Sequence, residues 1–145
     1  MKKLIIFLPF IFITIVIFSC SSDEVTGNDA TRLSGLYKAI VFIEPGSNDE
    51  GLDILANNGL LTIQFDRNFT VSGQLIIPEN IGSNYAPIDT NYGGTYTLNG
   101  DTLRFNNTND ILDNPVVYFI VKDSTIETPV YQGRFALFKI ILEKQ

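Results

Sequence analysis

Residues 94–105, Gly-Thr-Tyr-Thr-Leu-Asn-Gly-Asp-Thr-Leu-Arg-Phe, carry the clearest local signal for the fold of this chain. Two segments of alternating apolar and polar residues flank the pair Asn99-Gly100. This pair tolerates the two positive φ angles of a type I′ turn, and such turns join antiparallel strands. The stretch therefore predicts a β-hairpin whose core-facing side chains are Tyr96, Leu98, Leu103 and Phe105.

Short runs of the same kind fill the chain after its first thirty residues. They are rich in Val, Ile, Thr, Phe and Tyr and are separated by Gly, Asn, Asp and Pro, as is typical of all-β proteins. Besides the hairpin, they predict strands at residues 35–43, 59–65, 69–77, 116–122, 125–127 and 134–143. We expect a small antiparallel up-and-down β-barrel of about eight strands, because closure removes exposed sheet edges. A β-sandwich is the alternative.

Two longer stretches between these runs are expected to be loops. One covers residues 44–58, which are acidic and rich in Asn and Gly, and the other covers residues 78–91. If the strands alternate up and down, loops that lie on the same rim can form a mouth.

The first twenty residues predict an export signal. Two lysines precede an apolar run over residues 4–18, which is short for a membrane span and is interrupted by Pro9. The run ends in Ser19-Cys20, which resembles a bacterial lipobox. That resemblance implies cleavage after residue 19 and acylation of Cys20, and several acyl chains give stable anchoring. Because Cys20 is the only cysteine, no intrachain disulfide can form.

The segment after Cys20 predicts a tether followed by one domain. Residues 20–31 are small and polar, as expected of a flexible linker, and residues 32–145 suffice for a single domain. Ser-Ser-Asp-Glu at residues 21–24 resembles the export tag of Bacteroidetes lipoproteins, which implies the outer face of the outer membrane. We therefore expect a lipid-anchored protein of the cell envelope.

The charge of the chain argues against two classes of partner. Removal of residues 1–19 takes away two lysines and no acid, so the formal charge falls from −6 to −8. An acidic chain without a basic cluster is not expected to bind nucleic acid. Electrostatic docking onto anionic lipid is equally disfavoured, so membrane attachment is expected through the lipid on Cys20.

The region from Leu33 to Lys144 resembles the lipocalin-like domains of bacterial lipoproteins. Gly35 and Tyr37 stand where lipocalins carry Gly-x-Trp, and Arg134 stands where the family places an Arg at the last strand. The resemblance implies that Arg134 packs over Tyr37 at the barrel base, a cation–π contact of about 0.5–2 kcal/mol. Alternatively, Tyr37 is an ordinary core aromatic and Arg134 a solvated charge.

Catalytic motifs are scarce in this chain. It contains no His, which removes the usual general base near neutral pH and the commonest zinc ligand. Acidic residues cluster in two loops and are most simply read as solvated turn residues: Asp49, Glu50 and Asp53, and Asp110 and Asp113. Residues 48–53 and 106–110 do not fit a calcium loop. We expect no enzymatic activity, no cofactor and no metal.

Two hypotheses for function remain. In the first, the barrel binds a small apolar or amphipathic ligand in a cavity lined by aromatic side chains, with these candidates: Phe42, Phe65, Phe69, Tyr96 and Phe119. In the second, side chains fill the barrel, and one of the two long loops contacts an envelope protein.

Overall fold

The computed structural model describes residues 27–45, 51–129 and 138–145 of the chain. Their elements, in chain order, are α1 (Gly27–Leu33), β1 (Gly35–Glu44), β2 (Leu52–Asp53), β3 (Leu60–Phe65), β4 (Thr70–Ile77), β5 (Ile88–Asn99), β6 (Thr102–Asn106), β7 (Phe119–Val121), β8 (Thr125–Glu127) and β9 (Lys139–Lys144).

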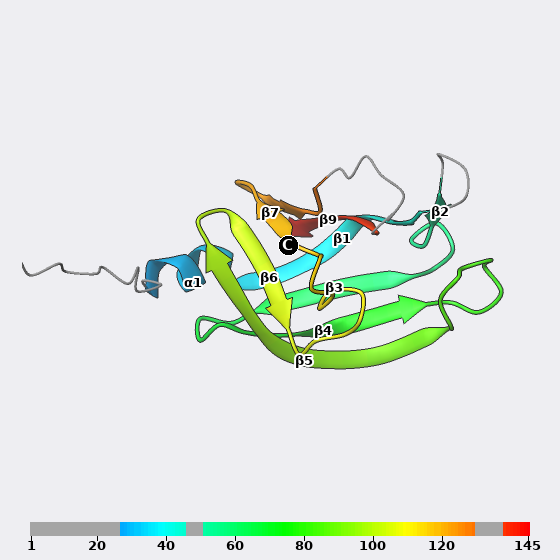
Figure 1. The fold of residues 1–145 in the computed structure, drawn as a ribbon, viewed down its shortest axis with the longest axis horizontal. Helices are drawn as coiled ribbons and strands as arrows, with labels where there is room; N and C mark the ends of the chain where they lie inside the picture. The colour runs from blue at the N-terminus through cyan, green and yellow to red at the C-terminus, as the bar shows by residue number, and fades with distance from the viewer. Residues whose placement is uncertain (1–26, 46–50, 130–137) are drawn as a thin grey trace, which may run out of the picture.

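The strands form a closed antiparallel barrel. From β3 to β9 each strand pairs with the next, and β1 pairs with both β3 and β9, so eight strands close the sheet on itself (Figure 1). The short strand β2 pairs with the end of β1 and lies outside this ring. The predicted all-β barrel of about eight strands is confirmed, and the β-sandwich alternative is excluded.

The central hairpin forms with the predicted core face but a different turn. Leu98 pairs with Leu103 and Tyr96 with Phe105, and all four side chains are buried. The two loop residues are Gly100 and Asp101, and of these only Gly100 has a positive φ, of 59°. This pattern matches a type II′ turn, so the predicted type I′ turn at Asn99-Gly100 is wrong.

Two other predicted strands are shorter in the structure because turns take their first residues. Phe69, with a φ of 61°, ends the β3–β4 turn, so β4 begins at Thr70. The expected strand 116–122 is reduced to β7, because Asn114 accepts hydrogen bonds from the backbone of Val116 and Val117. The expected strand 134–143 is seen as β9, and residues 134–137 lie outside the described part.

The two predicted loops are partly ordered as strands. The stretch 44–58 contains β2 and the fully buried Ile54. The stretch 78–91 ends earlier than expected, because β5 begins at Ile88 and runs for 12 residues. Its additional inward-facing residue is Tyr92, which is 8% exposed.

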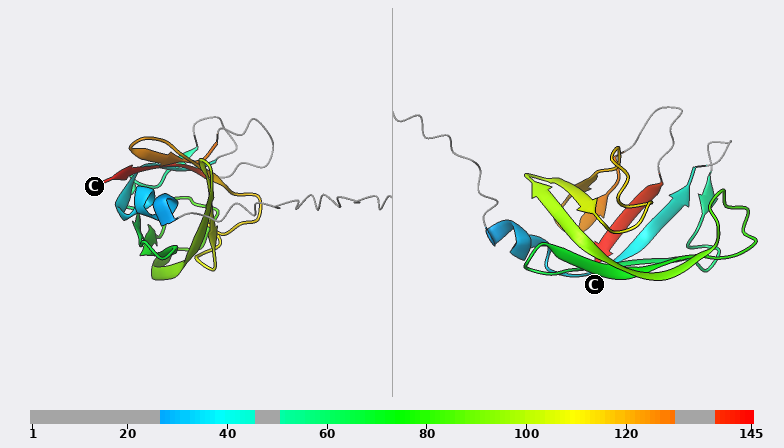
Figure 2. Two further views of the ribbon diagram at one scale, coloured as in Figure 1. Left: turned by 90° about the vertical axis from the view of Figure 1, so that its left-hand side faces the viewer. Right: turned by 60° about the horizontal axis from the view of Figure 1, so that its bottom comes forward.

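The connections between strands are short at one end of the barrel and long at the other. The short turns 66–69, 100–101 and 122–124 lie at one end of the barrel, which we call the closed end. The described residues that connect the strands at the other end, the open rim, are 45, 51–59, 78–87, 107–118, 128–129 and 138 (Figure 2). The described parts of both loops predicted as a possible mouth therefore share one rim.

A helix covers the closed end. α1 lies across this end of the barrel (Figure 2, left), and its Ala30 and Leu33 are 0% and 1% exposed. Arg32 of the same helix forms an ion pair of 2.8 Å with Asp101 in the β5–β6 turn. α1 thus occupies residues that we expected to belong to the flexible tether, and it joins them to the barrel core.

Candidate functional site

A buried carboxylate fixes one loop of the open rim. Glu44, the last residue of β1, is only 2% exposed. Its carboxylate accepts hydrogen bonds from Ser83 Oγ at 2.5 Å, from the Asn84 backbone N–H at 2.9 Å and from Asn84 Nδ2 at 2.8 Å. The two oxygens of a carboxylate together offer about four lone-pair positions for hydrogen bonds, so three donors satisfy most of the acceptor capacity of this buried group. The loop 78–87 is therefore tied to β1.

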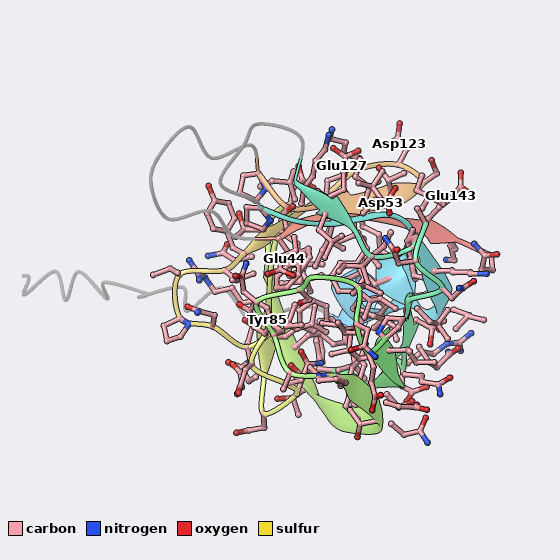
Figure 3. All side chains as sticks on the ribbon, turned by 90° about the vertical axis from the view of Figure 1, so that its right-hand side faces the viewer. Glu44, Asp53, Tyr85, Asp123, Glu127 and Glu143 are labelled. Atoms are coloured by element: carbon pink, nitrogen blue, oxygen red, sulfur yellow. The ribbon has the colours of Figure 1, made fainter. Side chains whose placement is uncertain are left out.

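The same loop carries Tyr85, whose aromatic ring lies at the rim. The ring of Tyr85 lies 4.9 Å from that of Phe138, and Phe138 lies 5.2 Å from Phe42. Figure 3, which looks at the barrel from the side of the open rim, places Glu44 and Tyr85 close to each other near the middle of the view. Tyr85 is 43% exposed, so this row of rings runs from the core to the surface.

A small pocket lies beside these rings. Its volume is about 30 Å³, and its lining residues are Tyr85, Asp110, Ile111, Asn114, Val117, Thr128, Phe138 and Ile140. A cavity needs on the order of 10–15 Å³ to hold one water molecule. The pocket therefore has room for one or two water molecules and not for a larger molecule. A second, more open concavity of about 360 Å³ lies within the curve of loop 78–87.

The barrel interior below the rim is packed with aromatic rings. Phe65 contacts Tyr96 at 5.1 Å and Tyr37 at 5.2 Å, and Phe105 contacts Phe119 at 5.2 Å. All three pairs are edge-to-face, a geometry that aromatic pairs prefer. Four of the five candidate ligand-lining residues are buried, namely Phe42, Phe65, Tyr96 and Phe119.

Phe69, the fifth candidate, is only partly buried. It lies in the β3–β4 turn at the closed end, where its ring is 5.3 Å from that of Tyr96. The structure thus joins Phe65, Phe69, Tyr96 and Phe119 into one aromatic cluster, together with Tyr37 and Phe105. Phe42 lies apart from this cluster and contacts Phe138 near the rim.

A cation lies over Tyr37 at the barrel base. Lys144 pairs with Tyr37 across β1 and β9, and its Nζ lies 5.8 Å from the centre of the Tyr37 ring. Gly35 has a φ of 137°, and a Cβ there would come within 2.9 Å of Lys144 Cε. Arg134, which the resemblance places over this ring, lies outside the described residues. Burial raises the pKa of Tyr37, and the charge of Arg32 opposes this effect.

The sequence did not reveal the role of Tyr92, a buried residue of β5 whose side chain forms a hydrogen bond to β3. Its hydroxyl donates to the backbone oxygen of Thr62 at 2.8 Å, and burial raises its pKa above the ordinary value. The ring crosses Gly73, where a Cβ would lie 2.7 Å from the Tyr92 hydroxyl and 2.0 Å from the Thr62 oxygen. A glycine within the strand 69–77 was the available signal, since strand glycines often mark such a close approach.

The acidic clusters are not brought into one site by the described residues. Asp53 Oδ1 accepts a hydrogen bond from the Ala56 backbone, and Asp113 Oδ2 accepts one from the Asn107 backbone. Asp110 lines the small rim pocket. Asp49 and Glu50 lie outside the described residues, as does Cys20. Within the described ranges, no group of three or more His, Cys, Asp or Glu is placed to hold a metal ion.

In residues 27–45, 51–129 and 138–145, no helix has the length and apolar character needed to cross a bilayer.

The strand pairing places this chain among small closed antiparallel β-barrel proteins. The crystal structure of a "putative lipoprotein from Shewanella oneidensis" is similar, with a TM-score of 0.47 and 13% sequence identity over 84% of this chain and 96% of the other. No family model matches the chain, and no curated protein matches it. The assignment of the barrel rests on the pairing of β1 with β9 in the chain itself.

Proposed function

We propose that this protein is a cell-envelope lipoprotein, anchored through lipid on Cys20, whose filled lipocalin-like barrel supports contacts with another envelope protein. The observation that carries the second part is the aromatic cluster around Phe65. Its rings lie 5.1–5.9 Å from their neighbours within the barrel. Such packing leaves the rigid wall and the long loops as the surfaces that are available for binding.

The anchor is supported by the sequence alone. A short apolar run precedes Ser19-Cys20, and the acidic segment 21–24 follows. Together they favour an acylated protein at the outer face of the outer membrane. The chain would carry no enzymatic activity, since it has no His and one Cys that is taken up by the lipid.

The anchor is tested by intact mass spectrometry of the full chain expressed in a Gram-negative host and extracted from its membranes. We expect loss of residues 1–19 and addition of acyl groups. The matched control is Cys20→Ser, which should keep the signal segment and carry no lipid. An unmodified wild-type mass would contradict the anchor.

The contact role is tested by crosslinking the anchored protein in intact envelopes. We expect a discrete crosslinked partner that is lost when residues 79–86 or the β5 strand are altered, and retained when the closed-end turn 66–69 is altered. Absence of any discrete adduct in the wild type would count against this role.

A second candidate function is binding of a small apolar group at the open rim. It is favoured by the pocket beside Tyr85 and Phe138, whose lining combines the apolar side chains of Ile111, Val117 and Ile140 with the polar side chains of Asp110, Asn114 and Thr128. Because its volume is about 30 Å³, a ligand would have to separate Tyr85 from Phe138. Native mass spectrometry of the gently extracted protein decides the matter: a discrete mass released on denaturation would favour a ligand, and a clean protein mass would favour the filled barrel.

A further inference from the structure

The first half of β5 has a free edge. Residues from Ile88 to Gly94 pair with β4 on one side, whereas pairing with β6 begins only at Thr95. Figures 1 and 2 show β6 turning away from β5, which continues beside β4 toward the open rim. Among the described residues, no strand pairs with the other side of this segment. We call residues 89–93 the β5 edge.

The alternation of an antiparallel ladder fixes which groups the β5 edge presents. The Tyr96 N–H donates to the Phe69 oxygen at 3.0 Å, so Tyr96 directs its backbone groups toward the β4 side. The register between β4 and β5 has no shift, so every second residue before Tyr96 points the same way. Asp89, Asn91 and Gly93 therefore direct their N–H and C=O groups away from β4.

The β5 edge is open to solvent. The side chains of Asp89, Thr90 and Asn91 are exposed, and so is Gly93. Thr90 Oγ1 donates a hydrogen bond to the Asn91 oxygen at 3.1 Å, so this oxygen has a local donor instead of an N–H from a neighbouring strand. A row of unpaired backbone groups along about 17 Å is a template for another extended chain.

Charge selects between two kinds of occupant. Asp89 lies on the β5 edge, and its carboxylate accepts a hydrogen bond from Gln74 Nε2 at 3.3 Å. The ion pairs found among the described residues are Arg32–Asp101 and Lys122–Glu127, so Asp89 has no cationic partner there. Without residues 1–19 the chain has a formal charge of −8, so a second copy would bring acids to acids, whereas a cationic segment would complement this charge.

We propose that the β5 edge is a docking site at which an extended, lysine- or arginine-bearing segment of another envelope protein adds as a strand. Backbone hydrogen bonds to Asp89, Asn91 and Gly93 give the pairing, and the carboxylate of Asp89 together with the net negative charge of the chain selects the positive segment. The proposal rests on the proposed contact role and names the surface that performs it.

The direct test uses a labelled synthetic peptide, Lys-Thr-Val-Thr-Val-Thr-Lys amide, and the full-length lipidated protein in detergent. We expect saturable binding by fluorescence anisotropy and slower hydrogen exchange at the amides of Asp89, Asn91 and Gly93. N-methylation of alternate peptide residues should weaken binding by about tenfold or more, because two or three backbone hydrogen bonds are lost. Replacement of both lysines by glutamate should also weaken it.

A protein variant tests the same edge from the other side. Asn91→Pro removes an N–H that faces away from β4, a position at which an edge strand tolerates proline, and it should abolish peptide binding. The matched control Thr97→Ala, at an exposed position of β5 that already pairs with β6, leaves the β5 edge unchanged and should bind as the wild type does. If Asn91→Pro does not fold, the N-methylated peptide still tests the edge without altering the protein.

Three results would overturn the docking site. They are equal binding of the N-methylated and unmodified peptides, exchange protection outside residues 89–93, and a dimer that sedimentation detects in the wild type but not in Asn91→Pro. A crosslinked envelope partner that Asn91→Pro retains would remove this docking site and leave the proposed contact role standing. No discrete partner together with no peptide binding would remove both.

Discussion

The hydroxyl of Tyr92 reaches across β4 to the backbone oxygen of Thr62 on β3, at 2.8 Å. It can do so because Gly73, its partner on β4, has no side chain in the way. One residue pair therefore joins three neighbouring strands inside the barrel. The aromatic ring covers the glycine, and the buried hydroxyl finds an acceptor, as buried polar groups must.

Gly73→Ala should destabilise the protein strongly. The added methyl would lie 2.0 Å from the Thr62 oxygen and 2.7 Å from the Tyr92 hydroxyl, so backbone and ring would both have to move. Overpacking of this kind costs about 1–3 kcal/mol and occasionally more. The matched control is Gly93→Ala, whose methyl would meet its nearest atom, the Val71 oxygen, at an ordinary 3.6 Å. Urea unfolding measures both variants, and equal losses would contradict the close approach at Gly73.

Alkaline pH should reveal the burial of Tyr92. Burial raises its pKa in the folded protein, while an unfolded tyrosine titrates near pH ~10. A raised folded pKa means that stability is complete below pH ~10 and is lost as the pH rises above this value. Tyr92→Phe should therefore show a shallower fall in the free energy of unfolding between about pH 9 and pH 11.

The control for this pH dependence is Val71→Ala, which truncates a buried side chain without a titratable group and should lower stability while keeping the wild-type slope. Burial also raises the pKa values of Tyr37 and Tyr96, so part of the slope should remain in Tyr92→Phe. A slope for Tyr92→Phe as steep as that of the wild type would show that Tyr92 does not contribute.

Glu44→Ala should release the loop 78–87 from β1. It leaves the donors on Ser83 and Asn84 without their acceptor, at a cost of about 1–3 kcal/mol for groups that stay buried. We expect faster amide exchange at Asn84 and a lower melting temperature. Glu79→Ala, at an exposed position on the same loop, should change stability by less than about 0.5 kcal/mol. Unchanged exchange at Asn84 in Glu44→Ala would contradict the role of Glu44.

The closed-end helix should depend on its apolar face rather than on its ion pair. Leu33→Ala removes a side chain that is 1% exposed, and such truncations cost about 2–5 kcal/mol. Arg32→Ala breaks a pair whose side chains are 42% and 64% exposed, and exposed pairs contribute only about 0–1 kcal/mol. Thermal unfolding of the two variants should rank them in this order, and the reverse order would contradict the view that burial holds α1 in place.

Local pattern was enough to predict the barrel walls. The alternation in residues 94–105 predicts that Leu98, Leu103 and Phe105 face the core, and all three are buried. The pattern could not predict that the turn residues are Gly100 and Asp101. If the turn moves by one residue along the chain, the same side chains still face the core, and only the cross-strand pairs change. The short helix α1 was also missed, since seven residues give little periodicity and its stability comes from the barrel it covers.

The open rim was harder to predict than the walls. Loop 78–87 is fixed by Glu44, which lies 39 residues before Ser83 in the chain, and no local pattern carries such a long-range hydrogen bond. The sequence places Glu44 only at the start of an acidic loop. The five candidate ligand-lining residues stay a prediction: Phe65, Phe69, Tyr96 and Phe119 join one aromatic cluster and Phe42 lies apart from it. Their sequence pattern is the same for a filled core as for a lined cavity.

The pairing of β1 with β9 has a consequence for how the chain acquires its structure. Tyr37 and Lys144 face each other at the barrel seam, and the backbone N–H of Gln145 donates to the Leu36 oxygen at 2.9 Å. The barrel therefore cannot close until β9 is available to pair with β1. Contacts between such distant segments slow folding and leave strand edges exposed for longer. The edge of β1 that β9 covers in the native barrel therefore stays open in every folding intermediate in which β9 has not yet docked.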